Sequence, residues 1–223
     1  MHAVEVWGFH DPVSGFAHLA SAVLAAVVTV PLMKRALASG RGVASATFAL
    51  GVVTLFVLSG TYHLLGDGPA RAFFRRLDHA AIFFLIAATF TPVLAEHFSG
   101  VMRNLMLVAI WGFGLAGIIL KTVFFDVASY EVGLVLYLGM GWSGLAVGLL
   151  ALRRSGVLRM VPMAVGGLVY TLGAVLDFLN WPILMDGYVG PHELFHLCVS
   201  AAAACHWFYV HESAGRPALA AAR

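Results

Sequence analysis

The sequence predicts an all-α polytopic membrane protein, a seven-transmembrane helix bundle with an intramembrane metal site. Of the 223 residues, 61% are hydrophobic and 11% are charged, whereas soluble domains carry about 25% charged residues. The apolar residues come in seven blocks of about 20 residues, the length that a helix needs to cross the hydrocarbon layer. The charged residues stand mainly between these blocks. Because lipid offers no partner for backbone N–H and C=O groups, each block is expected to be helical.

The expected spans form a single membrane domain over residues 1–223, with connections too short to fold separately. The first block is a span and not a signal peptide, because its basic residues, Lys34 and Arg35, follow it instead of preceding it. Pro31 and Pro92 fall inside spans, where neighbouring groups satisfy the backbone that proline disrupts. The spans cover approximately residues 14–33, 43–64, 79–95, 101–120, 132–152, 161–181 and 191–210.

The charges exclude one class of partner and suggest an orientation. A formal net charge of +2 is too small to indicate a nucleic-acid partner. Seven spans place the loops alternately on two faces, with four Lys and Arg residues on the face of the N-terminus and nine on the other. The positive-inside rule therefore favours an outside N-terminus and a cytoplasmic C-terminus. Nothing in the sequence sets the oligomeric state.

Alternation of the spans brings five polar residues to one leaflet. The second span ends with Ser59 and His63, the third begins just after Asp78, and the seventh begins with His192 and His196. The end of an even span and the start of an odd span lie on the same side of the membrane. His192 and His196 are four residues apart, so both rings project from one side of a helix. Ionisable groups inside a span are costly and indicate function.

These residue types suit a catalytic zinc site. Three imidazoles, those of His63, His192 and His196, bind Zn²⁺ and leave its fourth position open. Zinc lowers the pKa of water to about 7, which gives hydroxide at neutral pH. Asp78 is expected to hold that water and accept its proton. Ser59 is a candidate hydrogen-bond donor to the water or to a developing oxyanion.

Several neighbours are expected on the same face with lesser roles. His18 is a candidate supporting residue, and His79, which points about 100° away from Asp78 on a helix, is expected to support the site from outside or to pack. Asp177 is interpreted as a neighbour that relays protons, binds a cation or pairs with Asn180 or an arginine. The opposite ends of the spans are expected to be apolar, with interfacial histidines at positions 97, 206 and 211.

A second interpretation of the same helix is a metalloprotease. Residues 192–196 read H-E-x-x-H, in which Glu193 would be the general base. That motif alone does not distinguish a protease from other zinc sites. If the protein is not a protease, Glu193 is a solvated residue at the helix start, favoured by the helix dipole.

The motifs also resemble a known family. SGTYH at 59–63, RLDHAAI at 76–82, TFTP at 89–92 and HELFH at 192–196 resemble the hemolysin III branch of the PAQR family, which includes the adiponectin and progestin receptors. The resemblance implies seven helices around zinc bound by His63, His192 and His196, with Asp78 reaching the metal through water. The sequence departs from the family at Asp177, where an aromatic residue is expected. The receptors also place their N-terminus in the cytoplasm, opposite to the charge count.

The wider superfamily contains alkaline ceramidases, so the resemblance implies hydrolysis of an amide or ester bond in a membrane lipid. The acyl chain is expected to enter between helices past Phe83, Phe84, Phe90 and Phe124. The expected location is the bacterial plasma membrane. Two non-enzymatic functions stay open: a pore-forming hemolysin, and a lipid or membrane-state sensor or receptor with structural zinc. A pore requires a continuous polar lining, which the apolar opposite ends do not favour.

Overall fold

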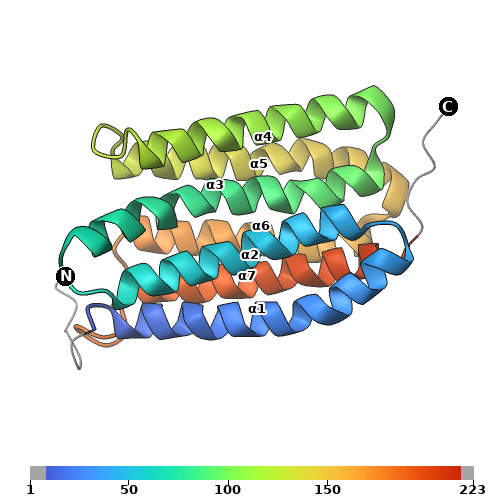
Figure 1. Cartoon of the computed structure of the whole chain (residues 1–223). Helices are drawn as coiled ribbons and strands as arrows, with labels where there is room; N and C mark the ends of the chain where they lie inside the picture. Colours follow the sequence, from blue (N-terminus) through green and yellow to red (C-terminus); the bar gives the residue numbers. More distant parts are fainter. Residues whose placement is uncertain (1–8, 217–223) are drawn as a thin grey trace.

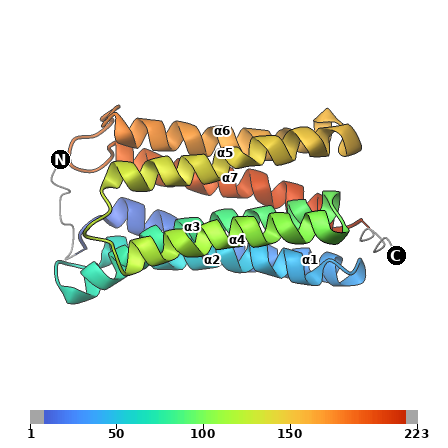
Figure 2. The same cartoon turned by 90° about the horizontal axis from the view of Figure 1, so that it is seen from above.

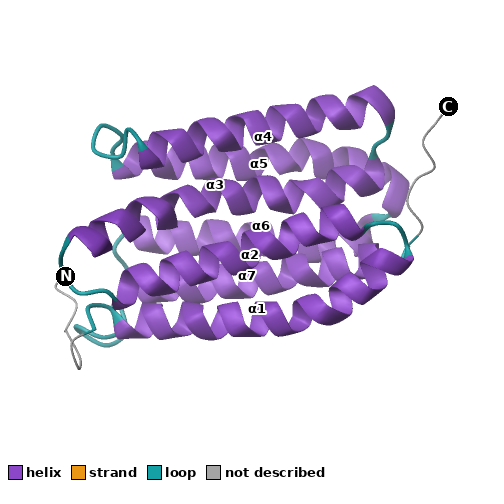
Figure 3. Ribbon diagram, in the orientation of Figure 1, coloured by secondary structure: helices purple, strands orange, loops and turns teal. Residues whose placement is uncertain are grey.

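The computed structural model describes residues 9–216, except for the side chains of 153–155, as seven helices that run side by side (Figure 1). Arg223, one of the charges in the orientation count, lies outside the described residues. The helices are α1 (Pro12–Ala38), α2 (Gly42–Leu64), α3 (Pro69–His97), α4 (Gly100–Thr122), α5 (Tyr130–Ser155), α6 (Val157–Phe178) and α7 (Pro191–Ala214). Short loops at the two ends of the bundle join them (Figure 3). The all-α seven-helix fold predicted from the sequence is confirmed.

Three helices that begin at the end where the site lies start with a proline. Pro12, Pro69 and Pro191 stand in the first turns of α1, α3 and α7, where a missing N–H costs no hydrogen bond. Helix α3 begins ten residues before the expected start of the span at position 79. Its first turns carry Arg71, Arg75 and Arg76, which the sequence prediction left out because they precede the apolar block. Asp78 therefore lies well inside a helix instead of just before one.

Helix α3 lies at the centre of the bundle. It contacts α2, α4, α5 and α7, and the view from above shows α5, α6 and α7 on one side of the bundle and α2, α3 and α4 toward the other (Figure 2). The outer faces carry exposed apolar side chains such as Leu24, Val27, Leu105 and Val108. This arrangement matches a bundle whose outer surface faces lipid.

Six of the seven helices are long and apolar enough to cross a membrane by length and composition; α7 is not among them. Its 24 residues include four histidines and two glutamates, which lower its mean hydropathy. His196 and His206 are nevertheless buried. Helix α7 is therefore polar on the inside, where it carries the site.

An apolar layer of buried side chains occupies the middle of the bundle. Phe48 and Val52 from α2, Leu85 and Phe90 from α3, and Val199 from α7 are all buried in one hydrophobic cluster. Their positions fall in the middle of their helices. Polar side chains gather at the two ends of this layer.

Candidate metal centre

Three histidines converge at one end of the bundle. His63 lies in the last turn of α2, and His192 and His196 lie in the first two turns of α7. One ring nitrogen from each histidine takes part in a cluster, and these three nitrogens all lie within 4.8 Å of one another. The Nε2 atom of His192 is 3.5 Å from that of His63 and 3.1 Å from that of His196. The histidines that helix alternation grouped from the sequence are thus brought together.

The start of α7 is held in place by Glu193. Its carboxylate accepts a hydrogen bond from the backbone N–H of Gly190 at 2.8 Å and one from the Ser14 hydroxyl at 3.2 Å. This is a capping interaction, in which a glutamate at the third helical position satisfies a free backbone donor. Glu193 does not line the cavity described below, so its contacts fit a role at the helix start and not that of a general base.

Two carboxylates face the outer nitrogens of two of the histidines. The Nδ1 atom of His63 lies 3.1 Å from Asp11, and the Nδ1 atom of His192 lies 3.1 Å from Asp177. Asp11 stands at the N-cap of α1 and also accepts a hydrogen bond from Arg71 at 3.0 Å. Burial raises the pKa of Asp11, but the hydrogen bonds from His63 and Arg71 outweigh it and hold the pKa well below its usual range.

The third histidine pairs with another histidine. The Nδ1 atom of His196 lies 3.1 Å from Nδ1 of His18, and the Nε2 atom of His18 lies 3.2 Å from the backbone oxygen of His196. Both rings are buried. The structure therefore places His18 beside His196, in the supporting position expected from the sequence.

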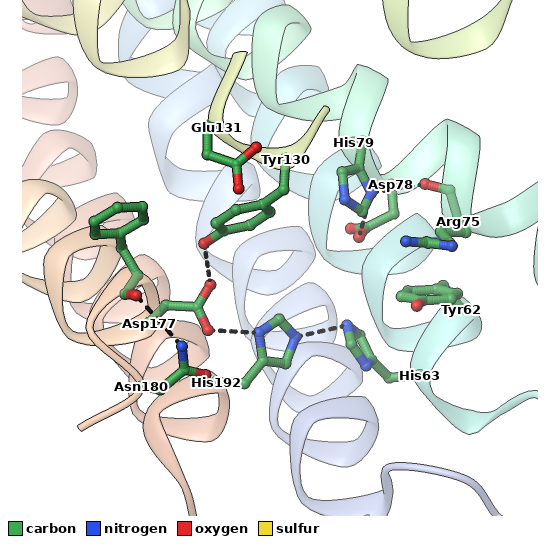
Figure 4. A pocket seen from close by; sticks show the side chains of 11 residues that line it. Tyr62, His63, Arg75, Asp78, His79, Tyr130, Glu131, Asp177, Asn180 and His192 are labelled. Atoms are coloured by element: carbon green, nitrogen blue, oxygen red, sulfur yellow. Dashed lines mark hydrogen bonds and ion pairs between the residues drawn. The ribbon is translucent and has the colours of Figure 1, made fainter. Parts of the chain in front are cut away.

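A cavity of about 410 Å³ opens beside the histidines (Figure 4). It takes residues from α2, α3, α5, α6 and α7, and Asp78 lies across it from His192. Its lining consists of Tyr62, His63, Arg75, Asp78, His79, Tyr130, Glu131, Asp177, Phe178, Asn180 and His192. The cavity is therefore largely polar, and two of the three clustered histidines, His63 and His192, stand in its wall.

The two predicted catalytic residues occupy different positions. Asp78 is buried on α3, with its carboxylate 3.6 Å from Nδ1 of His79, and it lines the cavity without belonging to the histidine cluster. Ser59 is also buried, one turn before His63, but it does not line the cavity. His79 lines the cavity as well, beside Asp78 and outside the histidine cluster.

The lipid path expected past four phenylalanines does not coincide with this cavity. None of the four phenylalanines expected along a lipid path lines this cavity. Phe83 and Phe90 are buried in the core, and Phe124 is exposed on the α4–α5 connection.

The opposite end of the bundle is not purely apolar. Glu96 on α3 is buried, forms an ion pair with Arg159 of α6 and accepts a hydrogen bond from the Tyr209 hydroxyl at 2.7 Å. His97 lies 2.8 Å from the same hydroxyl and is buried, so it is not interfacial. We call Glu96, His97, Arg159 and Tyr209 the distal cluster. Sequence reasoning missed it because its members come from three helices.

Asp11 was also missed, and the contact of Asp177 with His192 was not among the roles considered for it. Alternation puts the start of the first span on the same face as the site. The position of Asp11, immediately before Pro12, could therefore have identified it as a candidate site residue. Asp177 contacts His192 and accepts a hydrogen bond from the Tyr130 hydroxyl at 2.6 Å. It pairs with neither Asn180 nor an arginine among the described contacts.

The donor set fits a transition-metal ion. Three imidazole nitrogens without a thiolate suit zinc, copper, iron or nickel, and zinc sites with three protein ligands leave a position open. The outer nitrogens already have hydrogen-bond partners, which leaves the clustered Nε2 atoms of His192 and His196 facing one another at 3.1 Å. A cation between them would relieve the repulsion of their lone pairs.

Comparison with known proteins places the whole site inside one family. A family model described as Haemolysin-III related matches residues 8–207. Hemolysin-3 of Bacillus cereus is 33% identical over 179 residues, which cover 78% of either chain. Monocyte to macrophage differentiation factor of Homo sapiens is 30% identical over 177 residues, covering 74% of this chain and 70% of the relative. The chain, with every site residue inside the matched range, therefore belongs to the haemolysin III family of integral membrane proteins.

Proposed function

We propose that this membrane protein is a zinc-dependent hydrolase that cleaves an amide or ester bond of a membrane lipid. One observation carries the proposal: the ring nitrogens of three histidines cluster together, and two of these histidines, His63 and His192, line a cavity that Asp78 also lines. His63, His192 and His196 would hold the ion. Zinc, when bound, supplies Lewis acidity that polarises a carbonyl group and makes water more acidic.

Asp78 supplies the proton chemistry in this proposal. Its carboxylate lines the cavity but stands apart from the histidine cluster, so it is free to face a water molecule. It accepts the proton of the attacking water and returns a proton to the leaving group. Ser59, a buried hydroxyl one turn from His63, is the candidate donor to the developing oxyanion, a role typically worth about 10²-fold in kcat.

A lipid is the substrate class that the position of the cavity favours. Its volume of about 410 Å³ lies within the usual range for small-molecule sites. It lies at the end of a bundle with apolar outer faces, where a lipid headgroup would meet polar residues such as Arg75 and Tyr62. Relatives from Bacillus support the bacterial plasma membrane as the location.

The test compares two conservative variants in cells that express the protein. Asp78→Asn removes the proton acceptor and is expected to abolish any rise in free fatty acid or sphingoid base measured by lipidomics. Glu193→Gln is the matched control, because glutamine still caps a helix start, and it is expected to retain activity. Identical lipid profiles for the unmodified protein and Asp78→Asn, with zinc retained in both, would favour a membrane-state sensor instead.

A protease and a pore would each give a different result. A protease of the H-E-x-x-H type would lose activity in Glu193→Gln. A pore would give stable unitary conductance in planar bilayers, and the apolar layer around Phe48 and Leu85 is the feature that argues against it. The distal cluster lies beyond that layer, so polar residues at both ends do not by themselves make a continuous path.

A further inference from the structure

The three clustered histidines have their outer nitrogens occupied by specific acceptors. Asp11 lies 3.1 Å from Nδ1 of His63, and Asp177 lies 3.1 Å from Nδ1 of His192. These two acids come from the start of α1 and the end of α6. The two carboxylates therefore reach the cluster from helices that contribute none of its three histidines.

These contacts determine which ring nitrogen carries the proton. A carboxylate only accepts hydrogen bonds, so Nδ1–H of His63 and of His192 donate, and their Nε2 atoms keep a free lone pair. The backbone oxygen of His196 accepts from Nε2 of His18, which leaves Nδ1 of His18 to accept from Nδ1 of His196. All three Nε2 atoms thus present lone pairs to the same point.

Each carboxylate is itself anchored by another side chain. Arg71 donates to Asp11 at 3.0 Å and to the backbone oxygens of Tyr62 and Leu65 at 3.1 and 2.7 Å. Asp11 is therefore fixed to the end of α2 that carries His63. The second oxygen of Asp177 accepts from the Tyr130 hydroxyl at 2.6 Å, so a chain of hydrogen bonds runs from Tyr130 through Asp177 to His192 (Figure 4).

We infer that Asp11 and Asp177 are positioning residues that orient His63 and His192 for the metal and raise their basicity as ligands. The inference rests on the metal site of the proposed function. Carboxylates bound to ligand histidines typically change metal affinity by about 10–100-fold. Neither acid touches the cluster's centre, because each contacts the nitrogen that points away from it.

The experiment measures zinc affinity of the purified full chain in micelles by competition with a chromophoric chelator. Asp11→Ala and Asp177→Ala are each expected to weaken zinc binding by about 10–100-fold. The Asn variants keep a hydrogen-bond acceptor without the charge and are expected to fall between. Asp126→Asn is the matched control: Asp126 pairs with Arg76 at 2.6 Å on the surface, and this variant is expected to bind zinc as the unmodified chain does.

A second measurement separates orientation of the ligands from general damage to the fold. At saturating cobalt, Asp11→Asn and Asp177→Asn are expected to shift the visible d–d absorption bands, while their far-UV circular dichroism matches that of the unmodified chain and Asp126→Asn leaves the bands unchanged. Zinc affinities indistinguishable from that of the unmodified chain for both Ala variants would overturn the inference.

The inference and the proposed function fail in different ways. An unmodified chain that binds no zinc overturns both. Stoichiometric zinc, with the expected losses in the Asp11 and Asp177 variants but no lipid turnover, supports the positioning roles and overturns the hydrolase.

Discussion

Close packing of α4 against α3 depends on a glycine at position 117. A Cβ atom added there would stand 2.3 Å from the ring of Phe83, whereas ordinary contacts begin at 3.4 Å. The ring would have to retreat by about 1.1 Å, the difference between those two distances. Phe83 is fully buried, and the ring of Tyr137 lies against it with centroids 4.7 Å apart. Gly117→Ala is therefore expected to strain the α3–α4 interface.

The expected cost follows from two opposing contributions. Overpacking a tight core typically costs about 1–3 kcal/mol, while replacing a helical glycine by alanine gains up to about 1 kcal/mol. Gly112 lies on the same helix with nothing within 4 Å of its added Cβ. Gly112→Ala should therefore gain helix stability without causing a steric overlap. The free energy of unfolding should therefore differ between the two variants by about 1–3 kcal/mol, with Gly117→Ala the less stable.

Unfolding in mixed micelles titrated with denaturing detergent measures this difference. The double variant Gly117→Ala/Phe83→Leu tests the assigned contact, because a smaller side chain should relieve the overlap and give a non-additive cycle. Equal stability of Gly117→Ala and Gly112→Ala would refute the close approach of these helices.

Three further predictions concern the two polar ends. Arg159→Met leaves the buried Glu96 carboxylate without its cation and should lower the free energy of unfolding by about 3–5 kcal/mol. The double variant Arg159→Met/Glu96→Gln should recover most of this loss, and no recovery would contradict the ion pair. Zinc at about 100 times its Kd should stabilise the unmodified chain by about 2.7 kcal/mol in a thermal unfolding assay, and a shift of the same size in His196→Ala would count against the site. Glu193→Ala should lower the free energy of unfolding by about 1 kcal/mol through loss of the α7 cap, measured against Glu193→Gln, which should lose little.

The fold was largely predictable because each span is specified locally. Uninterrupted apolar blocks such as 43–64 gave helices with nearly the expected bounds. Helix α3 was the exception: its first turns carry Arg71, Arg75 and Arg76 on a segment that hydropathy excludes, although Pro69 marks the true start. Composition detects the part of a helix that lies in lipid, not the turns that extend beyond it.

The site was predictable where topology alone brings residues together. Alternation was enough to group His63 with His192, because the ends of even spans meet the starts of odd ones. It could not say that Asp177 would turn toward His192, nor that Glu193 would turn back to Gly190. Those contacts depend on rotation of each helix about its axis, which is fixed by packing among several helices.

The apolar layer gives the protein a sidedness. Phe48, Val52, Leu85, Phe90 and Val199 lie between the histidine end and the distal cluster, so the two polar ends of the bundle are separate from one another. If the proposed metal site is correct, its occupancy would depend on the metal ions available on the side of the membrane that the histidine end faces. Reversing the orientation of the chain would leave every contact intact and change only the compartment that the histidines face, which topology mapping determines.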